Sequence, residues 1–105
     1  MGTMILEHAV LDVRPGNRDA FEAAFDQAKT LIAGSPGFRH LRLLRCVESP
    51  DRYLLLVDWE SLDDHTVGFR SSPAFEEWRR LLHHFYEPFP VVEHFDEVRH
   101  VAPGT

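Results

Sequence analysis

The chain has 105 residues, of which 44% are apolar and 27% charged, a composition typical of one globular domain and unlike that of a disordered or fibrous protein. Seventeen acidic residues against eleven basic ones give a net charge of -6, which would repel the phosphates of a nucleic acid. The longest aliphatic run, Leu54 to Val57, is far short of the ~20 residues of a membrane helix, and the single cysteine, Cys46, excludes an internal disulfide. We therefore expect a cytoplasmic protein with one domain over residues 4–101 that binds neither nucleic acid nor a membrane.

The first third of the chain predicts a strand followed by a helix. Aliphatic residues from Ile5 to Val13 indicate a strand, which ends at the proline and glycine turn of residues 14–17. From Arg18 the apolar residues recur at the spacing of three and four that is typical of an amphipathic helix: Phe21, Ala24, Phe25, Ala28, Leu31 and Ile32. Asn17 stands at the predicted helix cap, and Gly34 ends the helix.

The middle of the chain predicts an antiparallel hairpin. Phe38 to Val47 and Tyr53 to Trp59 are both rich in aliphatic residues, and a short turn with Pro50 separates them. Leu54 to Val57 are apolar at every position, whereas a strand with one solvated face would alternate. We therefore expect both faces of this sheet to be covered.

The last third predicts two helices and a final strand. Ser61 followed by Asp64 resembles a capping box, and Ser72 with Pro73 is a second helix start. In the second helix one continuous apolar stripe is formed by Phe75, Trp78, Leu82 and Phe85. Residues 87–90 break this helix, and Val91 to Val98 form the last strand.

This order of elements predicts an α+β fold, a ferredoxin-like split βαβ with a four-stranded antiparallel sheet and helices on one face. The helices leave the second face of the sheet bare. Because a monomer would then expose a large apolar patch, we expect a homodimer that packs sheet against sheet.

Several short motifs stand out along the chain. They are Arg14-Pro15-Gly16, Ser35-Pro36-Gly37-Phe38, Trp59-Glu60-Ser61 with His65, Ser72-Pro73 with Phe75, and the last strand around Val91-Val92-Glu93-His94-Phe95. Together they resemble the motifs of the antibiotic biosynthesis monooxygenase family of dimeric α+β barrels. The resemblance covers roughly residues 4–98. It implies a barrel completed by dimerisation, a pocket between sheet and helices in each subunit, and oxidation of aromatic polyketides or quinols without a bound cofactor. One branch of the family degrades haem.

The sequence departs from the family in two places. Several family oxygenases place an asparagine in the pocket, whereas the only asparagine here is Asn17. In the haem-degrading branch a helix histidine binds iron, and Trp78 falls near that position here. His83 and His84 follow five and six residues later and, as neighbours on a helix, point about 100° apart, so they cannot hold one metal ion together. We expect no metal ligands in this chain.

His65 is the leading catalytic candidate. Leu62 and Phe69 place it on the apolar face of its helix, where desolvation favours the neutral imidazole that can accept a proton. Removal of a proton from a phenol or an activated ring carbon creates an anion that reacts directly with dioxygen. A histidine on an apolar face is, however, more often a core residue bonded to a backbone carbonyl.

Aromatic residues around His65 are candidates for the walls of a substrate slot, since offset stacking orients a planar ring. The candidates are Trp59, Phe69 and Trp78, with Phe75 and Phe85 more simply explained by core packing. His40 and Tyr53 on the central strands could add polar contacts, depending on the strand register.

The sequence therefore supports two classes of function. The first is a cofactor-independent monooxygenase that acts on a small aromatic or quinol-type substrate with His65 as the base. The alternative is a dimeric protein that binds a small apolar ligand without chemistry, which the missing asparagine and the lack of a nucleophile and base pair favour. Haem binding or degradation is a distant third.

Overall fold

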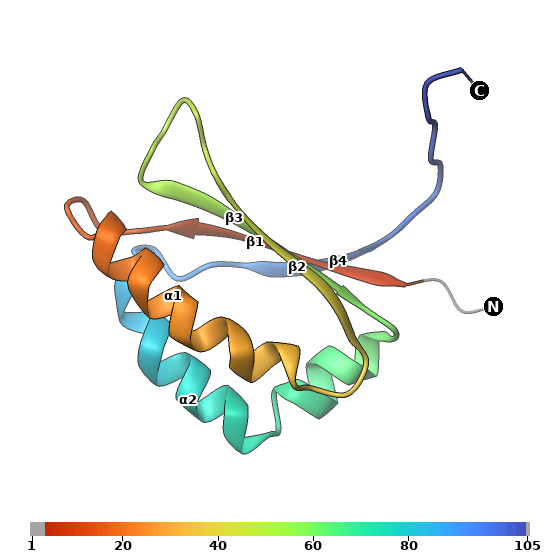
Figure 1. The fold of residues 1–105 in the computed structure, drawn as a ribbon, viewed down its shortest axis with the longest axis horizontal. Helices are drawn as coiled ribbons and strands as arrows, with labels where there is room; N and C mark the ends of the chain where they lie inside the picture. Colours follow the sequence, from red (N-terminus) through yellow and green to blue (C-terminus); the bar gives the residue numbers. More distant parts are fainter. Residues whose placement is uncertain (1–3, 105) are drawn as a thin grey trace.

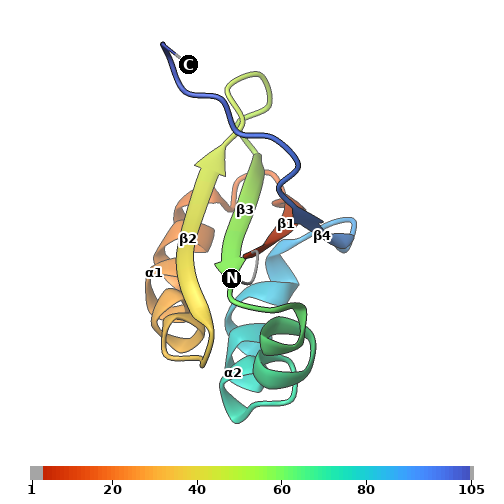
Figure 2. The ribbon, with the colours of Figure 1, turned by 90° about the vertical axis from the view of Figure 1, so that its right-hand side faces the viewer.

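The computed structural model of the protein describes residues 4–104 and contains one antiparallel sheet with the helices packed against one of its faces (Figure 1). In chain order the elements are β1 (Ile5–Asp12), α1 (Arg18–Ala33), β2 (Phe38–Arg45), β3 (Arg52–Trp59), the π-helix η1 (Asp64–Phe69), α2 (Pro73–Leu82), the 3-10 helix η2 (His83–Phe85) and β4 (Val92–Asp96). The strand order is β2-β3-β1-β4, as Figure 2 shows from the side. The predicted α+β fold is confirmed.

Helix α2 begins as the sequence predicts. The hydroxyl of Ser72 accepts a hydrogen bond from the amide of Phe75 at 3.3 Å, and Pro73 occupies the first turn, where no amide donor is needed. Ser61 likewise accepts a hydrogen bond from the amide of Asp64 at 3.2 Å. Side-chain caps therefore fix both ends of the segment that carries His65.

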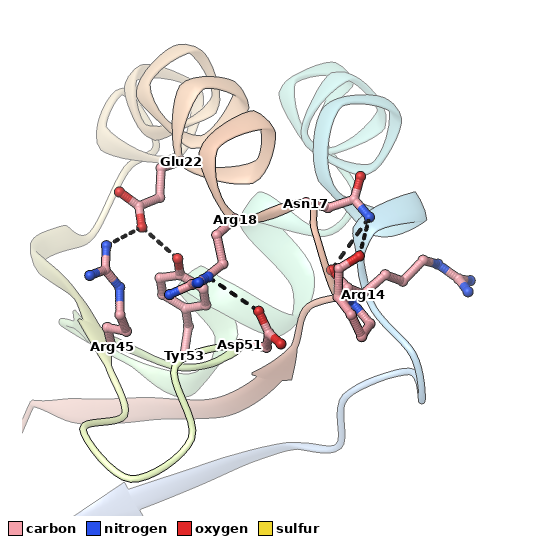
Figure 3. A network of polar contacts seen from close by, with 8 residues as sticks. Arg14, Asn17, Arg18, Glu22, Arg45, Asp51 and Tyr53 are labelled. Atoms are coloured by element: carbon pink, nitrogen blue, oxygen red, sulfur yellow. Dashed lines mark hydrogen bonds and ion pairs between the residues drawn. The ribbon is translucent and has the colours of Figure 1, made fainter.

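Helix α1 differs from the prediction at its start. Asn17 is the residue that precedes the helix, but its side chain makes no cap and instead donates to the carbonyls of Arg14 and Pro15 at 3.4 and 3.2 Å (Figure 3). The amide thus closes the turn that leads into α1.

Several element ends also differ from the prediction. The predicted continuous stripe through Phe85 is split, because the α-helix ends at Leu82 and tightens into η2. The last strand is shorter than Val91 to Val98, and β2 ends at Arg45 before Val47. Val13 lies just beyond β1 and forms an isolated bridge with Tyr86, which joins the start of the chain to the segment after η2.

The core lies between the helices and the inner face of the sheet. On β3 the inward residues Tyr53, Leu55, Val57 and Trp59 are buried, and the residues between them are half-buried. Helix α1 contributes its predicted apolar positions Phe21, Phe25, Ala28 and Ile32. The strands thus alternate in burial even where their sequence is apolar throughout.

The outer face of the sheet bears no helix (Figure 1). Val10, Leu54 and Leu44 lie side by side on three adjacent strands of this face. Val10 is 36% exposed and Leu44 is 41% exposed, and Phe95 on β4 is 47% exposed. The bare apolar face expected from the sequence is therefore present. Within residues 4–104 no helix has the length and apolar character to cross a bilayer.

Candidate functional site

A cavity of about 530 Å³ lies between the inner face of the sheet and the helices η1 and α2, a volume in the range of small-molecule sites. Its apolar walls include Leu11, Leu55, Phe69, Phe75, Trp78 and Phe89. Its polar lining consists of Glu7, His65, Arg70, Arg79, His83 and Tyr86. The cavity therefore has an aromatic body and a small set of ionisable groups.

Glu7 is the acidic group of the cavity, and the strand register places it there. It lies on β1 opposite Val57 of β3 and opposite His94 of β4, on the buried face of the sheet. Only 5% of Glu7 is exposed. The indole nitrogen Nε1 of Trp59 donates to its Oε1 at 3.0 Å. Burial raises the pKa of Glu7, and the Trp59 hydrogen bond and the charge of Arg70 oppose that rise.

His65 lies against Glu7 on the wide turn of η1, a helix type that is rare and often found at functional sites. Its ring stacks on Trp59, with centroids 5.3 Å apart and planes at 19°. Its Nε2 is 3.3 Å from Oε1 of Glu7, and its Nδ1 is 2.8 Å from Nε2 of His94.

The imidazole of His65 is neutral in the folded protein at neutral pH. Only 3% of the residue is exposed, and burial, with the charges of Arg70 and His94, lowers its pKa from 6.5 to about 3. Glu7, His65 and His94 thus form one polar chain that starts at the cavity lining with Glu7 and His65, both buried, and continues to the half-buried His94. Burial and the charge of Arg70 also lower the pKa of His94.

Arg70 and Arg79 give the cavity its positive charge. Arg79 is 3.5 Å from the carboxylate of Glu76, whereas Arg70 forms no ion pair with any residue of the described chain, 4–104. Arg70 is exposed and lines the cavity. A guanidinium with no ion pair among residues 4–104 therefore faces the same space as Glu7.

Three of the residues that the sequence predicts for the site line the cavity together: His65, Phe69 and Trp78. Trp59 is fully buried and is not part of the lining. Because its indole lies against the ring of His65 and bonds Glu7, Trp59 supports the polar groups and is not a wall.

The structure does not bring His40 and Tyr53 to this cavity. His40 projects from the outer face of β2, with its side chain 75% exposed and 3.9 Å from the carboxylate of Asp58. Tyr53 points inward but lies at the far end of β3, where its hydroxyl donates to Glu22, which Arg45 also holds at 2.6 Å (Figure 3). Register and strand position, which the sequence does not fix, separate both residues from His65.

The adjacent histidines His83 and His84 differ in their position relative to the cavity. His83 lines the cavity and is packed against Phe89, with ring centroids 4.9 Å apart. His84 is not among the lining residues. Among residues 4–104 no three His, Cys, Asp or Glu side chains come together in a way that could hold a metal ion.

Sequence reasoning missed Glu7 and His94 as site residues. A signal for Glu7 was available, because it shares the parity of Ile5, Ala9 and Leu11, and a carboxylate in the buried row of a strand is unusual. His94 could be found only with the pairing of β1 and β4, which places it beside Glu7. The polar chain is thus a product of strand register.

Comparison with known proteins identifies a family and several relatives of this chain. The family model described as antibiotic biosynthesis monooxygenase matches residues 4–81. YczJ of Bacillus subtilis (strain 168), an uncharacterised protein, is 50% identical over 95 residues, which are 90% of this chain and 100% of YczJ.

Solved structures of similar fold include a candidate antibiotic biosynthesis monooxygenase from Bordetella bronchiseptica, with 41% identity, a TM-score of 0.88 and coverage of 92% of this chain and 99% of that one. SnoaB, a cofactor-independent oxygenase from Streptomyces nogalater, shares the fold at 19% identity with a TM-score of 0.73, over 98% of this chain and 99% of its own. The chain belongs to the antibiotic biosynthesis monooxygenase family.

Proposed function

We propose that the protein is a cofactor-independent monooxygenase that acts on a small aromatic or quinol-type substrate. The observation that carries the proposal is the cavity itself, in which aromatic walls meet a buried pair, Glu7 and neutral His65, at one end. Phe69 and Trp78 are the proposed walls for a planar ring. The pair is the proposed site of proton removal, which is the role that the sequence predicts for His65.

The chemistry requires no external reductant. A base removes a proton from a phenol O–H or an activated CH₂ group of the substrate, and the electron pair stays on the substrate as a delocalised anion. This anion reduces dioxygen and combines with it at carbon, the peroxide takes up a proton, and loss of water leaves a carbonyl. A CH₂ group and O₂ thus become C=O and H₂O, and in a phenol the O–H and the ring C–H of the attacked carbon supply the two hydrogens of the water. The protein's tasks are to orient the ring, remove the proton and stabilise the anion.

Arg70 is suited to stabilise the substrate anion. The substrate gains a negative charge when its proton leaves, and a guanidinium without an ion-pair partner in the described chain would attract that charge. His65 is neutral and Arg79 is already close to Glu76, so Arg70 is the cation that we propose to act on the anion.

Oxygen uptake with a panel of hydroquinones and anthrones tests the proposal. We expect uptake with at least one compound and a loss of about 10²-fold or more in the double variant Glu7→Ala, His65→Ala, because general base catalysis contributes about 10² to 10⁴. His84→Ala is the matched control, since His84 is exposed and outside the cavity, and it should keep the rate. If the protein binds these compounds saturably but never consumes oxygen, the alternative of a ligand-binding protein is correct.

We also propose that the active form is a homodimer. Proteins of this family are typically dimeric, and the bare outer face of the sheet offers the row of Val10, Leu54 and Leu44. Packing two such faces would remove from water the apolar side chains that a monomer exposes.

A further inference from the structure

The two oxygens of the Glu7 carboxyl group have different surroundings. The contacts with Trp59 and His65 both fall on Oε1. In the described chain no buried side-chain oxygen or nitrogen lacks a hydrogen-bond partner. Since Glu7 lines the cavity and neither contact uses Oε2, that oxygen is accessible from the cavity. Glu7 therefore offers a substrate a lone pair that the protein does not occupy.

His65 offers no such lone pair. Its Nε2 faces Glu7 at 3.3 Å, its Nδ1 is bonded to His94 at 2.8 Å, and Trp59 stacks along its ring. A proton transferred to His65 would place a cation in a buried site next to the charge of Arg70. His65 is therefore held as a structural partner of Glu7.

We propose that Oε2 of Glu7 is the atom that takes the proton from the substrate and that His65 is a positioning residue. This inference rests on the proposed function and identifies the atom that accepts the proton of the substrate. The substrate C–H or O–H bond breaks, its electron pair stays on the substrate, and a new O–H bond forms at Oε2. The same proton then passes to the peroxide, which regenerates the carboxylate before water leaves.

The surroundings of Glu7 suit a carboxylate that takes up and releases a proton. Burial disfavours the charged form and makes the carboxylate a stronger base than an exposed one, whereas the Trp59 indole and Arg70 keep the charged form available. The ring of His65 is held between Glu7, with Oε1 3.3 Å from its Nε2, and His94, with Nε2 2.8 Å from its Nδ1. These contacts fix the direction in which Oε2 points.

Proton removal can be measured apart from oxidation. Under argon in D₂O, the exchange of the CH₂ protons of anthrone is followed by NMR, with calorimetry for its binding. We expect Glu7→Gln, which keeps the shape of the side chain, to lower exchange about 10²-fold or more with binding changed less than about threefold. Glu7→Asp keeps a carboxylate one methylene away and should exchange at an intermediate rate. Glu48→Gln, at an exposed position of the turn between β2 and β3, should behave as the wild type.

The role of His65 is tested in the same assay. His65→Gln should lower the exchange rate less than Glu7→Gln does and should keep its rise with pH, because the acceptor remains. In Glu7→Gln that rise should be absent. If Glu7→Gln exchanges normally and His65→Gln does not, His65 is the acceptor and our assignment is wrong.

The outcomes also separate this inference from the proposed function. Exchange that depends on Glu7, without oxygen uptake in air, would uphold the acceptor and overturn the monooxygenase. Oxygen uptake that survives Glu7→Gln would uphold the monooxygenase and overturn the acceptor. A wild type that neither exchanges the CH₂ protons of anthrone nor consumes oxygen with any compound of the panel would overturn both.

Discussion

Two arginines of the cavity act on different histidines. Burial and the charge of Arg70 lower the pKa of His94, and burial and the charge of Arg79 lower the pKa of His83. Because removal of a nearby positive charge favours the protonated imidazole, Arg70→Gln should raise the pKa of His94 and leave that of His83 unchanged, and Arg79→Gln should do the reverse. NMR titration of the two imidazoles checks this prediction, and each variant is the control of the other. Equal shifts of both histidines in both variants would contradict it.

His65 also links folding to pH. The pKa of His65 in the folded protein is about 3, below its usual value near 6.5. As the pH falls, the unfolded chain therefore binds a proton at this histidine before the folded protein does. The stability that this group contributes is fully present above pH 6.5 and is lost as the pH falls from there toward about 3.

We therefore expect the free energy of unfolding of the wild type to fall between pH 6.5 and pH 5, and to fall less in His65→Gln. Urea unfolding at several pH values measures the difference between the two slopes. Glu7 changes the free energy of unfolding in the opposite direction. Because its pKa is raised in the folded protein, the stability that it contributes is lost as the pH rises through that pKa. A steeper loss in the variant than in the wild type would contradict the prediction.

At the scale of the element, the turn before β2 depends on one glycine. Gly37 has φ of +83°, and a Cβ at this position would collide with the side chain of Asp64 at the start of η1. The amide of Glu60 also bonds the carbonyl of Gly37 at 2.8 Å. This turn therefore packs directly against the helix that carries His65.

Gly37→Ala should lower the free energy of unfolding by about 1 to 3 kcal/mol, because it adds backbone strain to the collision. Gly34→Ala is a matched control, since Gly34 has φ of -84° and its nearest neighbour would be 3.6 Å away. It should change stability by less than about 0.5 kcal/mol. Thermal or urea unfolding of both variants measures the difference, and equal losses would show that the turn tolerates a side chain.

Short sequence motifs were enough to predict the order of the helices and strands. The form of η1, the length of β4 and the polar groups of the site depend on tertiary contacts. Ser72 and Pro73 specify a helix start within a few residues, so the prediction needed no knowledge of the fold. The wide turn of η1 and the shortening of β4 have no such local signal. In the site, Phe69 and Trp78 followed from helical spacing, whereas the meeting of Glu7 with His94 depends on which residues β1 and β4 pair.

At the scale of the whole molecule, the sheet separates two apolar surfaces. One lines the core and the cavity, and the other is the bare face with Leu56 near its centre, opposite His8 and Arg42. Leu56→Arg would place a charge in the proposed dimer interface. We expect it to convert a dimer into a monomer in light scattering coupled to size exclusion. Val47→Arg, on the hairpin loop where Val47 is 87% exposed, should remain dimeric. A wild type that is monomeric at all concentrations would contradict the proposed assembly.

The chain contains two tryptophans, and both lie at the cavity. Trp78 lines it, and Trp59 donates a hydrogen bond to the carboxyl group of Glu7 at the polar end of the cavity. No other indole dilutes their signal. The intrinsic fluorescence of this protein is therefore an optical reporter of its cavity. A compound that enters it should quench Trp78, and ionisation of Glu7 should shift the emission of Trp59. A library of candidate substrates can thus be screened by light on the unmodified chain, before any reaction is known.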